Sequence, residues 1–214
     1  MKMVDIPKAW ISDIESLMAT GQRVILGLTG TPGAGKSSLA EALAAHFGAV
    51  ATVVPMDGYH LANIELSRLG LADRKGAAHT FDAAGFAALM ARIRAPAPDE
   101  TVYAPVFKRE IEEPIAGAIP VLPRHRLVIT EGNYLLLQSG AWARVRPLLD
   151  ACWFIDITDE NRMERLIGRH MRFGRSADAA RAWIAGNDAL NAADIDRTRP
   201  LADRIITWPP ASKN

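Results

Sequence analysis

The sequence predicts an α/β fold in which helices flank a five-stranded, mainly parallel sheet. Short apolar runs rich in β-branched residues alternate along the chain with longer segments of helical periodicity, which is the order of repeated β-α-β units. Most of these runs lack the alternation of polar and apolar residues that marks a strand with one solvent-facing side, so we expect both faces of the sheet to be covered. The strands are expected at residues 24–28, 52–56, 127–130, 153–157 and 204–208.

Helical periodicity occupies much of the remaining sequence. One helix comes before the first strand, and the others follow strands and form β-α-β units. Crossovers between parallel strands are nearly always right-handed, and we expect the same here. The predicted helices span residues 7–20, 36–47, 83–93, 141–149, 160–173 and 177–189.

A long interval separates the second and third strands, whereas a plain parallel crossover needs only about a dozen residues. After the helix at 83–93 this interval is rich in proline, and no single regular element can accommodate that spacing. Long irregular excursions in a compact domain are usually functional, so residues 57–125 are expected to form one wall of a binding pocket. A purely structural subdomain is the alternative. The prolines are Pro96, Pro98, Pro105, Pro114, Pro120 and Pro123.

The composition is that of an ordinary globular protein, and residues 1–214 are expected to form one domain. The sequence has 25 Lys and Arg against 24 Asp and Glu, and the net charge of +1 gives no general attraction to nucleic acid or to an anionic membrane. Any anion must therefore be bound by local groups.

Several features favour a cytoplasmic protein. The only cysteine, Cys152, lies in an apolar run, which indicates a buried thiol in a reducing compartment. The first residues carry acids and lack the apolar core of an export signal, and no apolar stretch reaches the roughly 18 residues of a membrane span. The oligomeric state stays open, and a homodimer is one option because the leading helix could pack on a second copy.

Directly after the first expected strand, the chain contains a glycine-rich loop that opens a helix. Glycines allow the backbone to curl so that several N–H groups point at one anion, and the helix adds the positive end of its dipole. Lys36 supplies a mobile cation for the outer phosphates of a nucleotide, the Ser37 hydroxyl is a ligand for Mg²⁺, and Ser38 lines the site. The loop therefore predicts a nucleoside triphosphate site. Its residues fit the pattern G-x-x-x-x-G-K-[ST]: Gly30, Thr31, Pro32, Gly33, Ala34, Gly35, Lys36 and Ser37.

Acidic residues end two of the predicted strands, Asp57 the second and Glu131 the third. The carboxyl ends of strands form the ligand crevice of doubly wound sheets, so Asp57 is expected beside the phosphates, where a carboxylate can accept the proton of an attacking hydroxyl. The alternative for Asp57 is a cap on the following turn or helix. Glu131 is expected to support Mg²⁺, and an ion pair with Lys36 is its alternative.

Arginines recur at helical spacing near the predicted helix at 160–173. Intervals of three and four residues place them on one helix face. A solvated face usually mixes charges of both signs, so this unbalanced stripe favours a lid, within residues 160–190, that closes over the transferring phosphoryl group and excludes water. A solvated face is the alternative, and the choice among the arginines stays open. They are Arg162, Arg165, Arg169 and Arg172.

Together these segments resemble a known family, the P-loop kinases that include uridine kinase, bacterial pantothenate kinase and phosphoribulokinase. The matching segments follow the family order over nearly the whole chain, which most resembles a small bacterial branch labelled as putative fructose transport system kinases. The resemblance implies a P-loop NTPase fold with a mobile lid, and ATP-dependent phosphorylation of an alcohol group on a small metabolite. The segments are GTPGAGKSS, MDGYHLAN, HTFD, TEGNYLLL, RLIGRHMRFGR and AWIAGNDALNAADIDRTRPLAD.

The resemblance also implies catalytic roles for individual residues. The family's base falls on Asp57, and its glutamate beside the metal falls on Glu131. The lid arginines fall on the segment from Arg165 to Arg172: Arg169 is expected, with Lys36, to act on the transferring phosphoryl group, and Arg165 and Arg172 to contact the nucleotide.

Residues that the resemblance places around the acceptor come from several segments. Asp82 could instead cap the next helix, Tyr103 could pack, Arg109 could be a surface cation, and the two asparagines could lie on a helix surface. The segment around Tyr103 lacks the histidine of the pyrimidine-binding loop in uridine kinases, which weakens uridine as the substrate. The acceptor candidates are Asp57, Tyr59, His60, Asp82, Tyr103, Arg109, Asn187 and Asn191.

The expectation is therefore a kinase that uses ATP and Mg²⁺ to phosphorylate a hydroxyl of a small metabolite, with a sugar such as fructose ranked ahead of a nucleoside or pantothenate. A nonenzymatic regulator that only senses the nucleotide is the alternative. The expected partner is the small-molecule acceptor, and neither nucleic acid nor a membrane is expected.

Overall fold

The computed structural model describes residues 6–172, 174 and 176–207 of the chain, and its centre is a five-stranded parallel sheet. The strand order is β2-β5-β1-β6-β7, which confirms the predicted α/β fold. All five strands fall where the apolar runs predict them, although position 208 of the last one lies outside the described residues. The strands are β1 (Val24–Thr29), β2 (Ala51–Pro55), β5 (Leu127–Glu131), β6 (Ala151–Asp156) and β7 (Arg204–Thr207).

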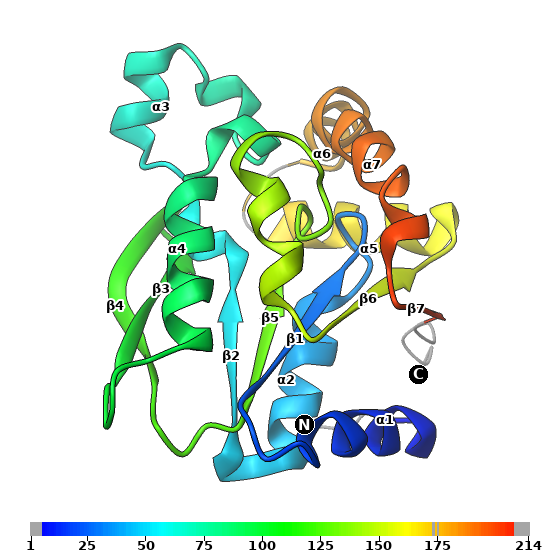
Figure 1. Ribbon diagram of the computed structural model, residues 1–214. Coiled ribbons are helices and arrows are strands. Elements are labelled where there is room, and N and C mark those ends of the chain that lie inside the picture. Colours follow the sequence, from blue (N-terminus) through cyan, green and yellow to red (C-terminus); the bar gives the residue numbers. More distant parts are fainter. Residues whose placement is uncertain (1–5, 173, 175, 208–214) are drawn as a thin grey trace.

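Helices cover both faces of the sheet, as the lack of polar alternation requires (Figure 1). One face packs against α1 (Lys8–Met18) and α2 (Lys36–Phe47), where Trp10 and Leu39 meet the strand residues Leu26 and Ile129. The opposite face packs against α4 (Ala83–Arg94), where Phe86 and Met90 meet the alternate strand residues Ile25 and Val128. Successive strand residues thus enter two separate apolar cores.

The segment between β2 and β5 contains more regular structure than its prolines suggest. After α3 (Asn63–Leu69) and α4, the chain forms an antiparallel hairpin of β3 (Val102–Lys108) and β4 (Glu113–Val121), which the sequence analysis did not predict. Pro105 lies at the register shift between Ala104 and Val106, where the ladder is interrupted in any case. A two-stranded ribbon has two edges, and proline is tolerated at edges and bulges because its missing N–H is not needed there.

The predicted helix at 141–149 is wrong. The structure has two short 3₁₀ turns there, Gly140–Arg144 and Arg146–Leu148, because Pro147 lacks the N–H that a continuous α-helix would require. Trp142 nevertheless packs into the core as an apolar periodicity would predict.

The C-terminal helices differ from the prediction in their boundaries. The segment α5 (Asp159–Arg172) confirms the predicted helix at 160–173, whose last position lies outside the described residues. The predicted helix at 177–189 is divided: α6 (Ala177–Trp183) passes through a π-turn, Ile184–Asp188, into α7 (Ala189–Asp196). In Figure 1, α5 to α7 and the α3 region lie above the ends of the strands, on either side of the sheet's carboxyl edge.

The other short helical turns between the main elements are 3₁₀ turns. They are Gly48–Val50, Met56–Tyr59, Ala72–Arg74, Ala78–Thr80 and Arg199–Leu201.

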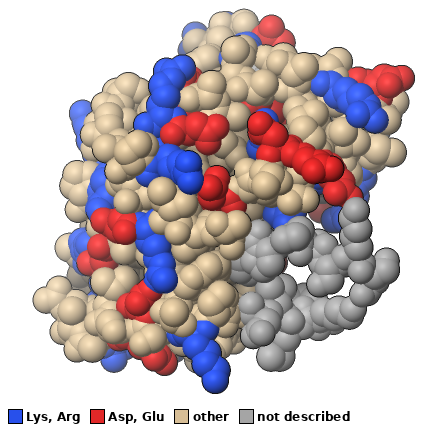
Figure 2. Space-filling model, turned by 90° about the vertical axis from the view of Figure 1, so that its right-hand side faces the viewer, with Lys and Arg blue, Asp and Glu red and all other residues tan. Residues whose placement is uncertain are grey.

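No described helix is long and apolar enough to cross a bilayer. On the side of the molecule shown in Figure 2, basic and acidic side chains are intermixed, in keeping with the net charge of +1.

Gly132, directly after β5, allows the ends of β2 and β5 to approach closely. A Cβ at this position would lie 2.5 Å from the Cβ of Met56. We expect Gly132→Ala to lower the free energy of unfolding by about 1–3 kcal/mol, since one of the two strand ends must shift. Gly186→Ala is the control, because a Cβ there meets nothing within 4 Å. Urea unfolding of both variants checks this, and equal stability of the two would contradict the close contact.

Candidate active site

A cleft of about 1160 Å³ lies over the carboxyl edge of the sheet. It is bounded below by the glycine-rich loop and the ends of β2 and β5, on one side by the β3–β4 hairpin and the α3 region, and above by α5 to α7. Sites for single ligands usually measure about 300–1,000 Å³, so this cleft has room for a nucleotide together with a small second ligand.

The glycine-rich loop connects β1 to α2 and bends through three glycines in left-handed conformations. Gly30, Gly33 and Gly35 have φ values of 147°, 88° and 93°, which side chains rarely adopt. A Cβ on Gly33 would lie 3.1 Å from the carbonyl oxygen of Arg162, so α5 packs directly over the loop. Gly30, Thr31 and Ala34 are buried behind the surface of the cleft. The loop residues that line the cleft are Pro32, Gly33, Gly35, Lys36, Ser37 and Ser38.

Lys36 begins α2 and is only 8% exposed. Its Nζ donates hydrogen bonds to the carbonyl oxygens of Gly30, at 2.9 Å, and Thr31, at 3.0 Å. Burial lowers the pKa of Lys36 to about 8, although the carboxylates of Glu131 and Asp57 oppose that shift. The amine therefore faces the cleft as a desolvated group, and an anionic phosphate beside it would favour its charged form.

Ser37 and Glu131 bring a hydroxyl and a carboxylate together at the end of β5. The Ser37 hydroxyl donates to Glu131 Oε1 at 2.9 Å, and burial together with the charge of Asp57 raises the pKa of Glu131 to about 6. Hydroxyl and carboxylate oxygens are the donors that Mg²⁺ prefers, so the pair fits the ion. The described residues hold no cluster of three or more acidic, Cys or His ligands, so the remaining ligands would be water and nucleotide oxygens.

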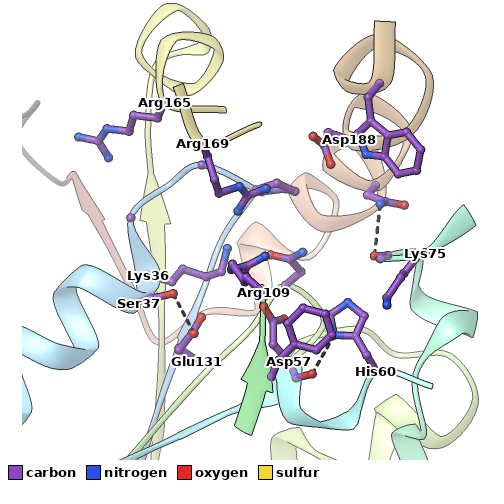
Figure 3. A pocket seen from close by; sticks show the side chains of 18 of the residues that line it. Lys36, Ser37, Asp57, His60, Lys75, Arg109, Glu131, Arg165, Arg169 and Asp188 are labelled. Carbon is purple, nitrogen blue, oxygen red and sulfur yellow. Dashed lines mark hydrogen bonds and ion pairs between the residues drawn. The ribbon is translucent and has the colours of Figure 1, made fainter. Parts of the chain in front are cut away.

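Asp57 lies in the turn that follows β2, and its carboxylate faces the same cleft (Figure 3). Arg109 Nη2 donates to Asp57 Oδ2 at 2.9 Å, in place of the helix cap that was the alternative for this aspartate. Burial raises the pKa of Asp57, but the electrostatic effects of His60, Arg109 and the more distant Lys36 and Arg169 outweigh burial and bring the pKa below its usual value. The carboxylate is therefore ionised at neutral pH.

The four arginines of α5 do not all face the cleft. Arg165, Arg169 and Arg172 line the cleft, whereas Arg162 pairs with Asp159 at 2.9 Å. In Figure 3, Arg169 extends from α5 toward Lys36 and Arg109, while Arg165 points to the side of the glycine-rich loop, where it donates to the Ala34 carbonyl oxygen at 3.3 Å. The face of α5 that carries these arginines is thus not simply solvated.

Aromatic rings and polar groups form the other half of the cleft. The His60 ring lies between the rings of Phe81 and Phe107, with 4.0 Å and 4.5 Å between ring centroids. Burial among these groups lowers the pKa of His60. Lys75 lies over the Phe107 ring at 5.2 Å, and its Nζ donates to Asn63 Oδ1 at 2.6 Å.

Asn191 is another predicted acceptor residue that the structure places in the cleft. It is 7% exposed, and its Nδ2 donates to the Gly76 carbonyl oxygen at 3.3 Å. The side chain of Asn187 lies outside the described part of the chain.

Three predicted acceptor residues do not line this cleft. Asp82 is exposed and caps α4, accepting from the Gly85 N–H at 2.8 Å, so its capping alternative was right. Tyr103 is 58% exposed on the hairpin, because alternate residues of a strand face opposite sides. Tyr59 packs against the core ring of Phe86, with 5.5 Å between ring centroids. The structure therefore places these three side chains outside the cleft lining, and their binding of the acceptor stays a prediction.

Sequence reasoning missed several cleft residues, among them Lys75, Phe107, Trp183 and Asp188. Asp188 carried a usable signal, because it lies three residues before Asn191 and so shares its helix face. Lys75 follows no recognisable pattern, and Phe107 depends on a hairpin that was not predicted.

A glycine-rich phosphate loop at the carboxyl edge of a parallel sheet, followed by a lysine and a hydroxyl ligand, defines a P-loop nucleotide-binding protein. The chain belongs to the Phosphoribulokinase / Uridine kinase family, whose family model matches residues 25–209. It is therefore an ATP-dependent phosphotransferase whose acceptor is a hydroxyl group of a small molecule.

Individual relatives are similar over most of their length. A protein of Schizosaccharomyces pombe named "Putative uridine kinase C227.14" is 33% identical over 201 residues, covering 89% of this chain and 85% of that protein. The "ATP-dependent kinase-like protein notR'" of Aspergillus versicolor is 37% identical over 159 residues, covering 71% and 92%. Among solved structures, a "putative fructose transport system kinase" from Silicibacter sp. TM1040 has a TM-score of 0.79 at 40% identity, covering 88% of this chain and 90% of that one.

Lys36→Met tests the phosphate-binding function of the loop. We expect ATP affinity to fall by at least about tenfold, since a charge-assisted hydrogen bond to phosphate is lost. The variant should stay folded, because burial already disfavours the Lys36 charge that is removed. Calorimetric titration with ATP measures the affinity, and Lys8→Met, at an exposed position of α1, is the control. Unchanged ATP affinity in the Lys36 variant would contradict the assignment.

Proposed function

We propose that the protein transfers the γ-phosphoryl group of ATP to a hydroxyl of a sugar such as fructose, with Mg²⁺ and with Asp57 as the base. The supporting observation is the position of the Asp57 carboxylate, which faces the same cleft as Lys36 and Glu131 and is ionised at neutral pH. A hydroxyl compound between Asp57 and the phosphate loop would be oriented for in-line attack.

The reaction uses the side chains of the cleft in sequence. The loop amides and Lys36 hold the β- and γ-phosphates of ATP, and the acceptor hydroxyl donates its proton to Asp57 while its oxygen attacks the γ-phosphorus. The bond from that phosphorus to the bridging oxygen breaks, and ADP leaves. Mg²⁺, held through Ser37 and Glu131, would neutralise charge on the phosphate oxygens.

The proposed lid is the segment around residues 160–190. Arg169 extends toward the place between Lys36 and Asp57 where charge would develop, Arg165 lies beside the phosphate loop, and Arg172 also lines the cleft. Closing α5 and α6 over the loop would exclude water from the transferring group.

The acceptor wall formed by residues 57–125 favours a small polyhydroxylated compound. It combines rings with hydrogen-bonding groups, among them His60, Asn63 and Lys75, and it meets Asn191 of α7. The outward direction of Tyr103 removes one group that a nucleoside site in this segment would use. The similarity to the Silicibacter protein also favours a sugar over a nucleoside or pantothenate. The buried free thiol of Cys152 favours a reducing, cytoplasmic location.

A screen of ADP release tests the proposed function. Fructose and other sugars, nucleosides and pantothenate are offered separately with ATP, and omission of Mg²⁺ is the control. We expect a sugar to give Mg²⁺-dependent ADP release with a phosphorylated product. Phosphorylation of a nucleoside or of pantothenate, and not of a sugar, would show that the proposed substrate is wrong. ATP binding without any phosphorylated product would favour the nucleotide-sensing regulator.

Asp57→Asn tests the base. We expect phosphoryl transfer to fall by about 10² or more while ATP affinity stays within about twofold, because the amide keeps the shape but cannot accept a proton. The control is Asp82→Asn, which keeps a side-chain oxygen for the α4 cap. Single-turnover kinetics with the identified acceptor compare the two variants. A parental rate for the Asp57 variant would remove the proposed base.

A further inference from the structure

The carboxylate proposed as the base is already engaged by Arg109. The guanidinium Nη2 lies 2.9 Å from Asp57 Oδ2, and both side chains are only partly exposed. A carboxylate in such a pair is a weaker base, because the cation stabilises its ionised form. The pair also occupies Oδ2, one of the two oxygens that an attacking hydroxyl could use.

The fold holds the two residues together from separate segments. Asp57 follows β2, whereas Arg109 follows β3, and the backbones meet at Gly58, where a Cβ would lie 2.5 Å from the Pro105 carbonyl oxygen. The Arg109 guanidinium also lies over the Phe107 ring, with 5.8 Å to the centroid. The pair is therefore positioned by packing of the hairpin onto the turn, and it is more than an incidental surface contact.

A second, smaller cavity lies next to the Arg109–Asp57 pair. It measures about 140 Å³ and is lined by Ser37, Asp57, Arg109 and Glu131, among others. One water molecule takes about 30 Å³, and the lining groups are polar, so the cavity can hold water within reach of Asp57. An unrestrained Asp57 could activate that water against ATP.

We propose that Arg109 is a positioning residue that restrains Asp57 until the acceptor arrives, and thereby suppresses ATP hydrolysis. In the suppressed reaction, a water oxygen bonds to the γ-phosphorus, the bond to the bridging oxygen breaks, Asp57 takes the water proton, and ADP and phosphate leave. The acceptor hydroxyl takes the place of the guanidinium on Asp57, so the base becomes free only when the correct nucleophile is present. This inference rests on the proposed role of Asp57.

The test measures ADP release from ATP and Mg²⁺ without any acceptor. Arg109→Met retains a long side chain on the Phe107 ring but removes the charge. We expect this variant to hydrolyse ATP at least about fivefold faster than the parent, since the freed carboxylate is more basic. Arg109→Lys should fall between the two, and the double variant Asp57→Asn with Arg109→Met should return to the parental rate or below. Arg92→Met, at an exposed ion pair with Glu100, is the matched control.

Each result decides the proposal. Hydrolysis in Arg109→Met that is unchanged or slower would overturn it and indicate that Arg109 acts on the phosphoryl group or the acceptor. Faster hydrolysis that survives in the double variant would also overturn it, because Asp57 would not be the restrained group. Should Arg109→Met fail to fold, Arg109→Gln and Arg109→Lys provide the same comparison. No acceptor enters this assay, so failure of the acceptor screen and failure of the restraint are separate results.

Discussion

The parallel pairing of β2, β5 and β1 determines where Asp57, Glu131 and the phosphate loop lie. In the register of these strands Glu131 is level with Pro55 of β2 and with Leu28 of β1, so the three strands end at one edge of the sheet. The residues that follow those ends are the Asp57 turn, the Glu131 carboxylate itself and the phosphate loop. Because the strands are parallel and in register, their carboxyl ends lie at the same edge of the sheet. Helices cover both faces of the sheet, so this edge is where a ligand can bind.

The same geometry concentrates charges that would be unfavourable if they were buried singly. Lys36 has its pKa lowered by burial, and Glu131 has its pKa raised by burial and by Asp57. Arg109 and Arg169 supply the cations that keep Asp57 ionised beside them. The cleft thus holds opposite charges that offset one another until an anionic nucleotide and a cation enter, and removing any one group changes the protonation of the others.

The sequence was sufficient to predict those parts of the site that short segments encode. The phosphate loop, Asp57 and Glu131 each follow a strand whose apolar run is readable, and strand ends in a parallel sheet are predictably adjacent. The hairpin was not predictable in this way, since Pro105 and Pro114 argue against strands unless one knows that they lie at a bulge and in a two-stranded ribbon. The outward direction of Tyr103 depends on that same register, and a shift of one residue would have turned it inward.

The acceptor wall shows why the reaction class was easier to predict than the substrate. Its groups come from the α3 region and the hairpin. They meet each other and α7 through tertiary contacts, such as the hydrogen bonds of Tyr134 Oη, at 2.7 Å, and Asn191 Nδ2, at 3.3 Å, to the carbonyl oxygen of Gly76. A compact motif binds ATP because every ATP presents the same phosphates. Each acceptor has its own shape, so its recognition is distributed over segments far apart in sequence. The Arg109–Asp57 contact joins these two halves, because the hairpin there touches the carboxylate that faces the phosphate loop across the cleft.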